Sequence, residues 1–219
     1  MTARDQRRVP TRRTAPVASG RHRADQIERR QRIIKAATEL LEESELEKIQ
    51  IRDVADRAGV ALATAYRYFS SKDHLYAAAI VQWSSEFFER VQTQGGNSGA
   101  TDADRLRRML RRTLGTLERW PQFIRAVIML ESSPDDNARE QLEIFSDQYA
   151  SAVQLCVQEL APETAESVLM VIGGVYKTEV RLWALNRTSI SEVERNLERT
   201  IDLIFGELPA SPSSQPPQV

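Results

Sequence analysis

Two short amphipathic helices joined at a single glycine, within residues 50–72, constrain the fold of this chain more than any other feature. In the first helix, Ile51, Val54, Ala55 and Ala58 recur at helical spacing. Gly59 ends that helix, because glycine adopts the left-handed turn conformation without a Cβ penalty. The second helix is expected from about residue 61 to residue 69. This spacing predicts a helix-turn-helix.

The turn between these helices determines which side chains face outward. The small Ala55 lets the helices cross closely, and Val60 with Ala65 fills the angle between them. The outer side of the second helix is narrow enough for the major groove of DNA, where side chains read base edges. The side chains expected on or near this outer side are Leu62, Ala63, Thr64, Arg67 and Tyr68.

The charge distribution points to the same partner. The chain of 219 residues has a net charge of −1, but residues 1–32 hold ten arginines and three acidic residues, which gives +7 there and −8 for the rest. This division suggests that one end binds a polyanion. Arg21 and Arg23 precede the first helix, Arg29 and Arg30 lie in its first turns, and we expect this arm to enter the minor groove. A solvated charge run in a disordered tail is the alternative.

Helical periodicity continues through the rest of the chain. Ser70 or Ser71 can cap a long fourth helix, the Gly-rich stretch 95–101 is expected to be a loop, and Ser191 with Glu194 forms a capping-box pattern. The predicted helices cover residues 25–43, 51–58, 61–69, 72–94, 102–119, 121–130, 136–160, 163–186 and 191–206.

The predicted fold is therefore all-α with about nine helices, and 41% hydrophobic residues with only nine Gly and nine Pro support a globular chain. We expect a disordered basic arm at residues 1–24 and a helix-turn-helix DNA-binding domain at 25–72. A long fourth helix joins it to a ligand-binding and dimerisation domain at 73–208, and a disordered tail follows at 209–219.

Residues that could carry catalysis or hold a metal are few and scattered. His22 lies in the arm, His74 follows the helix-turn-helix, and Cys156 is the single cysteine, so we find no catalytic triad, zinc set or phosphate loop. We expect no enzyme, no metal and no cofactor; Asp135 and Asp136 are expected to cap a helix. A lone cysteine is typical of a core residue in the reducing cytoplasm, and no apolar run is long enough to span a bilayer.

The helix-turn-helix segment resembles the TetR family of bacterial transcriptional regulators over residues 27–80. The resemblance rests on Arg-Asp-Val-Ala, Ala-Gly-Val and the stretch YRYFSSKDHL, which leads into the long fourth helix. It implies a dimer that binds a palindromic DNA operator, usually as a repressor. It also implies phosphate contacts from some residues and base or phosphate contacts from others. The first group is Tyr66, Tyr68 and Lys72, and the second is Arg52, Ala63, Thr64 and Arg67.

Three residues depart from the family pattern. Gln50 replaces a capping hydroxyl, and Ala65 replaces a larger aliphatic residue. Ala61 replaces the usual Ser or Thr at the start of the second helix of the helix-turn-helix, which is the recognition helix. Base specificity therefore does not transfer from relatives. Phe69 is expected in the core, and core packing is the alternative for the two tyrosines of the recognition helix.

The larger domain carries many aromatic and large apolar side chains, which predict a cavity for a hydrophobic small-molecule effector. Plain core packing is the alternative for each of them. The candidate ligand-binding residues are Trp83, Phe87, Met109, Trp120, Phe123, Val127, Phe145, Tyr149, Tyr176, Val180 and Trp183.

The last two helices carry more apolar residues than one small domain needs, and the corresponding helices of the family form a four-helix dimer interface. Gly173 and Gly174 would allow close helix approach there. Burial inside one subunit is the alternative. The candidate interface residues are Val168, Val171, Ile172, Val175, Leu182, Leu197, Ile201 and Ile204.

Several segments resemble a subgroup of the family, the actinobacterial repressors of cholesterol catabolism. These segments are the start of the first helix, the YRYFSSKDHL stretch, and the stretches WALNR and LIFG at the ends of the last two predicted helices. This resemblance implies a steroid or acyl-CoA effector, whose phosphates would meet Arg125 or Arg181. We expect the effector to shift the dimer between two spacings of its recognition helices through the fourth helix, which begins near Lys72. An activator, a regulator without a small-molecule effector and an architectural DNA binder are the alternatives.

Overall fold

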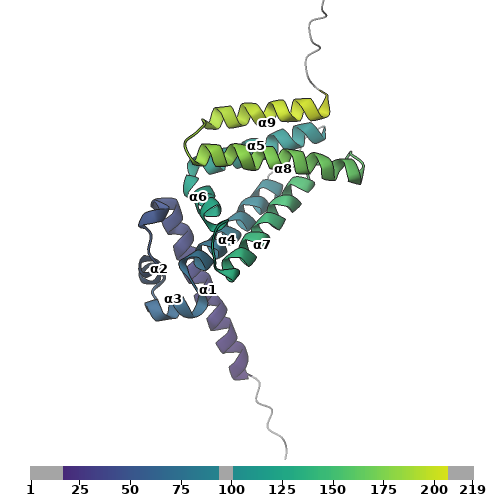
Figure 1. Ribbon diagram of the computed structural model, residues 1–219. Helices are drawn as coiled ribbons and strands as arrows, with labels where there is room; N and C mark the ends of the chain where they lie inside the picture. The colour runs from purple at the N-terminus through teal and green to yellow at the C-terminus, as the bar shows by residue number, and fades with distance from the viewer. Residues whose placement is uncertain (1–16, 94–100, 207–219) are drawn as a thin grey trace, which may run out of the picture.

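The computed structural model of the protein describes residues 17–93 and 101–206, with the side chains of residues 23–90 and 101–206. In these residues it has nine α-helices, one short 3-10 helix and no strand (Figure 1), which confirms the predicted all-α fold. The helices are α1 (Val17–Glu43), η1 (Leu46–Lys48), α2 (Ile51–Ala58), α3 (Leu62–Tyr68), α4 (Lys72–Thr93), α5 (Asp102–Arg119), α6 (Pro121–Leu130), α7 (Asp136–Gln154), α8 (Pro162–Ala184) and α9 (Ile190–Phe205).

Helices α1, α2 and α3 form a small domain at one end of the molecule (Figure 1). Its core contains Ile33, Leu41 and Val54, all fully buried, because each belongs to the apolar face of an amphipathic helix. The long helix α4 is anchored in this domain, since the buried hydroxyl of Tyr76 donates a hydrogen bond to the carbonyl of Ile49 at 3.2 Å. A movement of α4 would therefore be transmitted to the small domain.

The larger domain is a bundle in which α4 and α7 lie side by side, while α5, α8 and α9 are stacked at the end far from α2 and α3 (Figure 1). Helix α6 lies between these two groups. Ion pairs fasten α5 to α9: Arg107 contacts Glu198 at 3.1 Å and Asp202 at 2.6 Å, and Arg111 contacts Glu198 at 2.6 Å. These links hold the far end of the bundle together.

Several helix ends follow from local sequence signals, as predicted. The bounds of α5 and α6 are those expected: the Thr101 side chain caps α5 by accepting the Asp104 N–H at 3.1 Å, and Pro121 occupies the first turn of α6. Ser71 caps α4 by accepting the His74 N–H at 3.0 Å. Asp135 caps α7.

Other helix ends differ from the prediction. Helix α1 begins at Val17 instead of residue 25, so it includes the last part of the arm that we expected to be disordered. Ser189, not Ser191, caps α9 by accepting the Glu192 N–H at 3.2 Å, so the predicted capping box is wrong. Residues 1–16, most of the predicted loop and the predicted tail lie outside the described residues.

The end of α7 is decided by contacts with α5. The helix ends at Gln154, not at residue 160, because the buried carboxylate of Asp102 accepts the N–H groups of Gln158 at 2.9 Å and Glu159 at 3.0 Å. Arg105 pairs with Asp102 and donates to the Cys156 carbonyl at 3.0 Å. Burial alone would raise the pKa of Asp102, but these donors together lower it. Cys156 is buried in the core, as predicted.

None of the helices in the described part of the chain is long and apolar enough to cross a membrane.

Candidate DNA-binding surface and ligand pocket

The turn between α2 and α3 has the geometry that the sequence predicted. Gly59 is left-handed with φ 64°, its N–H reaches the Asp56 carbonyl at 3.2 Å, and the Val60 N–H reaches the Ala55 carbonyl at 3.0 Å. Ala55 and Ala65 are fully buried where the helices cross. At the start of α2, the Asp53 carboxylate accepts the Gln50 N–H at 2.8 Å, so a residue inside the helix closes its first turn. These contacts confirm the helix-turn-helix.

The outer face of α3 is exposed along its length. Ala63, Tyr66 and Arg67 are exposed, and Thr64 is half-buried beside them. Arg52 is exposed on α2. These side chains are available to a DNA duplex, the small ones to base methyl groups and Arg67 to base or phosphate oxygens.

Two of the predicted phosphate contacts are less accessible. The Tyr68 ring packs against the core, and its hydroxyl is buried without a hydrogen-bond partner in the described part of the protein. The Arg67 guanidinium lies 5.5 Å from the centroid of that ring. Lys72 is half-buried, with its Nζ 5.2 Å from the Tyr76 ring centroid. Tyr68 would have to change its side-chain conformation to touch a phosphate.

The basic arm is helical where it is described. Arg23 is exposed on α1, whereas the side chain of Arg21 lies outside the described residues. Arg29 is half-buried, and Arg30 packs over Phe69 with its guanidinium 5.3 Å from the ring centroid. Arg30 therefore contributes to the packing of the small domain, in which Phe69 is buried as predicted.

A hydrogen-bonded cluster joins the exit of α3 to the start of α7. The Ser70 hydroxyl donates to the Asp135 carboxylate at 2.8 Å and receives the Asn137 side-chain N–H at 3.1 Å. The Ser70 N–H donates to His74 Nδ1 at 3.2 Å, and burial lowers the pKa of His74, which keeps the ring neutral and able to accept. Hydrogen bonds from Ser71 first, and then from Ser70, lower the pKa of Asp135 to about 2. The DNA-binding and larger domains are therefore in direct polar contact.

A cavity of about 800 Å³ lies inside the larger domain, between α4, α5, α6, α7 and α8. Its wall is mainly aromatic: Trp83 stacks on Phe123 with centroids 4.3 Å apart and on Phe87 at 5.7 Å, and Tyr149 stacks on Tyr176 at 5.1 Å. A cavity of this size and lining suits an apolar molecule of drug size or larger.

The predicted ligand-binding residues fall into two groups. Those that line the cavity are Trp83, Phe87, Phe123, Val127, Phe145, Tyr149, Tyr176 and Val180. Three others do not line it and pack elsewhere: Met109 is fully buried in the core, and Trp120 and Trp183 are half-buried against it. The Arg119 guanidinium lies 4.8 Å from the Trp120 ring centroid.

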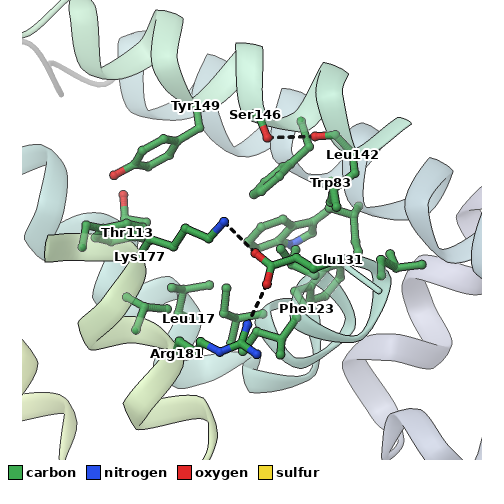
Figure 2. Close-up of a pocket in the computed structure, with 18 of the residues that line it drawn as sticks. Trp83, Thr113, Leu117, Phe123, Glu131, Leu142, Ser146, Tyr149, Lys177 and Arg181 are labelled. Atoms are coloured by element: carbon green, nitrogen blue, oxygen red, sulfur yellow. Dashed lines mark hydrogen bonds and ion pairs between the residues drawn. The ribbon is translucent and has the colours of Figure 1, made fainter. Parts of the chain in front are cut away.

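Of the three charged residues that meet at the cavity, the prediction included Arg181 and missed Glu131 and Lys177. Glu131, at the end of α6, contacts Lys177 Nζ at 2.9 Å and Arg181 Nη1 at 2.6 Å (Figure 2). Arg181 was suggested by the family resemblance, whereas Arg125 does not line the cavity. Lys177 and Arg181 are four residues apart, so they lie on one face of α8, and this spacing was visible in the sequence.

The predicted dimer-interface residues are divided between two faces. Val168, Ile172, Leu197 and Ile201 are buried inside the subunit, which is the alternative that the sequence left open. Val171 is 47% exposed, and Val175, Leu182 and Ile204 are half-buried. The same two helices also expose large apolar residues outside the predicted set. These are Met170 at 72% on α8 and Leu203 at 67% on α9, with Leu185 at 46% directly after α8.

In the described residues no group of three or more His, Cys, Asp or Glu side chains is arranged to hold a metal ion.

Comparison with known proteins places both domains. A family model described as "Bacterial regulatory proteins, tetR family" matches residues 33–79, and one described as "Tetracyclin repressor-like, C-terminal domain" matches residues 99–204. The HTH-type transcriptional repressor KstR of Rhodococcus jostii (strain RHA1) is 30% identical over 184 residues, which cover 83% of this chain and 85% of that protein.

Solved structures agree with this similarity. A TetR transcriptional regulator from Rhodococcus sp. RHA1 has a TM-score of 0.70 at 25% identity and is matched over 84% of this chain and 100% of that one. The transcriptional regulator FadR from Bacillus subtilis, solved in complex with stearoyl-CoA, has a TM-score of 0.60 at 18% identity, over 78% of this chain and 96% of that one. At that identity the second likeness shows the fold alone.

Proposed function

Because the chain belongs to the TetR family of bacterial transcriptional regulators, we propose that it is a dimeric repressor that an apolar effector with an anionic group releases from its operator. The effector class that the cavity favours is an acyl-CoA or a steroid acyl-CoA. The observation that carries the effector part is the aromatic cavity of about 800 Å³ with Lys177 and Arg181 at its lining. The protein would act in the cytoplasm, where its operator is.

The DNA-binding part rests on the exposed face of α3. Arg67 is the one strongly basic residue of α3 and is exposed, so it is a candidate for bidentate contact with a base or a phosphate. Ala63 and Thr64 lie on the same face and suit contact with a thymine methyl group. A twofold dimer would present two such faces to successive major grooves, as a palindromic operator requires.

The effector part rests on the lining of the cavity. An apolar body of the size of a steroid or a long acyl chain fits between the stacked aromatic rings, and burial of its surface supplies the affinity. The guanidinium and ammonium groups on α8 suit the phosphates of coenzyme A or a carboxylate. The similar proteins point the same way, since KstR is named a repressor and the Bacillus subtilis FadR structure contains stearoyl-CoA.

The mechanism we propose is a population shift. The free dimer holds its recognition helices at the spacing of the operator, and the effector stabilises a different spacing by binding that conformation better. Helix α4 connects the two events, because its start follows the recognition helix and Trp83 and Phe87 on its second half line the cavity.

The experiment is a gel-shift titration of the full chain on the DNA upstream of its own gene, at fixed salt with competitor DNA. Stearoyl-CoA and choloyl-CoA are the probes. We expect sequence-specific binding that one of them releases. The variant Arg67→Ala should weaken operator binding by about tenfold or more, the effect of losing one bidentate base contact. Arg57→Ala is its control, because Arg57 lies on α2, outside the recognition helix, and pairs with Glu43 of α1.

Two results would redirect the proposal. Specific binding that neither probe changes would favour a regulator without such an effector, and binding without sequence preference would favour an architectural DNA binder. An activator would bind the same DNA but raise transcription from it in a purified transcription assay. The double variant Lys177→Gln/Arg181→Gln should lose release by the CoA esters, whereas Arg195→Gln on α9 should keep it.

A further inference from the structure

Glu131 lies where the end of α6 meets the wall of the cavity. It is the residue that ends α6, and its carboxylate lines the cavity. One carboxylate oxygen contacts Lys177 Nζ at 2.9 Å and the other contacts Arg181 Nη1 at 2.6 Å. Figure 2 shows the carboxylate between these two cations, which come from α8. Glu131 therefore already holds the position that an effector's anionic group would need.

The charges at this point are unequal. A single carboxylate faces two cations, so one positive charge is left unmatched and attracts the carboxylate or phosphate of an effector. The Glu131 side chain is 28% exposed, so water can rehydrate it once the cations turn to the effector. Glu143 and Asp147 also line the cavity from α7, but no ion pair joins them to these two cations in the described structure. Exchange of one anion for another is thus possible without burying a bare charge.

The other end of α6 touches the DNA-binding domain. The Gln122 side-chain carbonyl, in the first turn of α6, accepts the N–H of Leu46 in η1 at 3.3 Å. Phe123 follows and stacks on Trp83 of α4 at 4.3 Å. Helix α6 has only ten residues, so it is a short rod, about 15 Å long, tied to α8 at one end and to η1 at the other.

We propose that Glu131 is a resident anion that an anionic effector displaces, and that this exchange frees the end of α6 and so weakens its hold on η1. The inference rests on the effector site proposed above. It makes operator release depend on the charge of the ligand as well as on its shape. A neutral molecule of the same shape fills the cavity and leaves the bridge from Glu131 to α8 in place.

The test compares acids with their neutral esters. Lauric acid and cholanic acid, each beside its methyl ester, are titrated into the full chain, with binding followed by tryptophan fluorescence because Trp83 lines the cavity. Operator release is followed by gel shift. In the wild type, the acids should release the operator, and the esters should bind with little release.

The variant Glu131→Gln removes the resident anion and keeps the size of the side chain. We expect it to bind the acids about tenfold more tightly, the effect of removing one competing charge-assisted contact, and the esters as the wild type does. Its operator affinity without ligand should already be lowered toward the effector-bound value. Glu118→Gln, at an exposed carboxylate of α5 that does not line the cavity, is the matched control and should behave as the wild type.

Three results would overturn the inference. Weaker binding of the acids by Glu131→Gln would mean that Glu131 positions the cations for the effector instead of competing with it. Full release of the operator from the wild-type protein by a saturating methyl ester would show that the charge of the ligand plays no role. This result does not depend on whether the variant folds. If none of the four probes bound the wild type, the proposed hydrophobic effector would be wrong, and so would the inference that rests on it.

Discussion

Two buried tyrosine hydroxyls on this protein have opposite environments. The hydroxyl of Tyr76 donates to the Ile49 carbonyl, whereas the hydroxyl of Tyr149 is buried and has no hydrogen-bond partner in the described residues. Burial raises the pKa of both groups, so both stay neutral. A made hydrogen bond stabilises the folded state modestly, and a buried hydroxyl without a partner costs about 1–3 kcal/mol.

Substitution by phenylalanine should therefore act in opposite directions at these two positions. We expect Tyr76→Phe to lower the free energy of unfolding by about 1 kcal/mol and Tyr149→Phe to leave it unchanged or raise it by about 1 kcal/mol. Chemical denaturation of the two variants beside the wild type measures both. A loss of stability in Tyr149→Phe equal to that in Tyr76→Phe would mean that its hydroxyl finds a partner in solution.

Asp135 makes the stability of the protein depend on pH. Its folded pKa of about 2 is lower than the ordinary value near 3.9, because hydroxyl and backbone N–H groups donate to the charged form. The stabilisation is therefore complete above a pH of about 4 and is lost as the pH falls toward the folded pKa. The variant Asp135→Asn keeps a good helix cap but cannot titrate.

We expect wild type and Asp135→Asn to differ in their pH profiles. Between a pH of about 5 and a pH of about 2.5, the wild type should lose more free energy of unfolding than the variant does. Denaturant titrations at several pH values, at constant ionic strength, give the two slopes. Parallel slopes would show that the Asp135 carboxylate has an ordinary pKa in the folded state.

At the scale of elements, α7 connects two surfaces. Its first turns contact the exit of α3 through Asn137 and Ser70, and Arg139 and Leu142 in the same part of the helix line the cavity. A ligand that moves this end of α7 would therefore also move the end of the recognition helix. The start of α7 therefore offers a second connection between the cavity and the recognition helix, besides the predicted one through α4.

The variant Ser70→Ala/Asn137→Ala should weaken the coupling between effector and operator. We expect the variant to bind the effector and the operator separately with nearly normal affinity. The loss of operator affinity that the effector causes should become smaller by about 1 kcal/mol, which is part of a typical coupling free energy. Gel shifts with and without saturating effector measure it. Ser84→Ala is the control, because Ser84 of α4 donates a hydrogen bond to Gln148 of α7 at 2.6 Å, away from the junction. An equal effect of both variants would argue against a specific route through the start of α7.

At the scale of the whole molecule, α8 and α9 expose an apolar face that one subunit does not cover. Met170, Val171 and Leu203 are the most exposed large apolar residues on these helices. Exposed apolar residues on two helices that pack against each other suit a twofold four-helix contact. The proposed dimer interface is thus centred on these residues instead of the buried part of the predicted set.

The variant Leu203→Glu should separate the dimer. A carboxylate placed in an apolar interface must be desolvated, and two copies would face each other across the twofold axis. We expect a monomer in light scattering and a loss of operator affinity of more than about tenfold, since the two half-sites are no longer bound together. Ile144→Glu, at a residue 38% exposed on α7, should stay dimeric. A dimeric Leu203→Glu would place the interface elsewhere.

The periodicity of the sequence identified buried faces but could not separate the cavity wall from the core. Aromatic residues at helical spacing indicate a buried face, but core and cavity wall have the same composition, so Met109 and Trp183 could not be told from Trp83. Glu131 was missed because its role depends on α6 meeting α8, forty-six residues later at Lys177. Local sequence holds no signal for such a meeting.

The sequence by itself determined the all-α fold, the left-handed turn at Gly59, and the starts of α5 at Asp102 and of α6 at Pro121. Periodicity, glycine conformation and helix caps act within a few residues of chain, so no tertiary contact is needed to place them. The tertiary structure alone decided where α7 ends, which face of α8 is buried, and which charges meet at the cavity. Those outcomes depend on helices far apart in the chain, and an amphipathic pattern specifies that a face is buried without specifying what covers it.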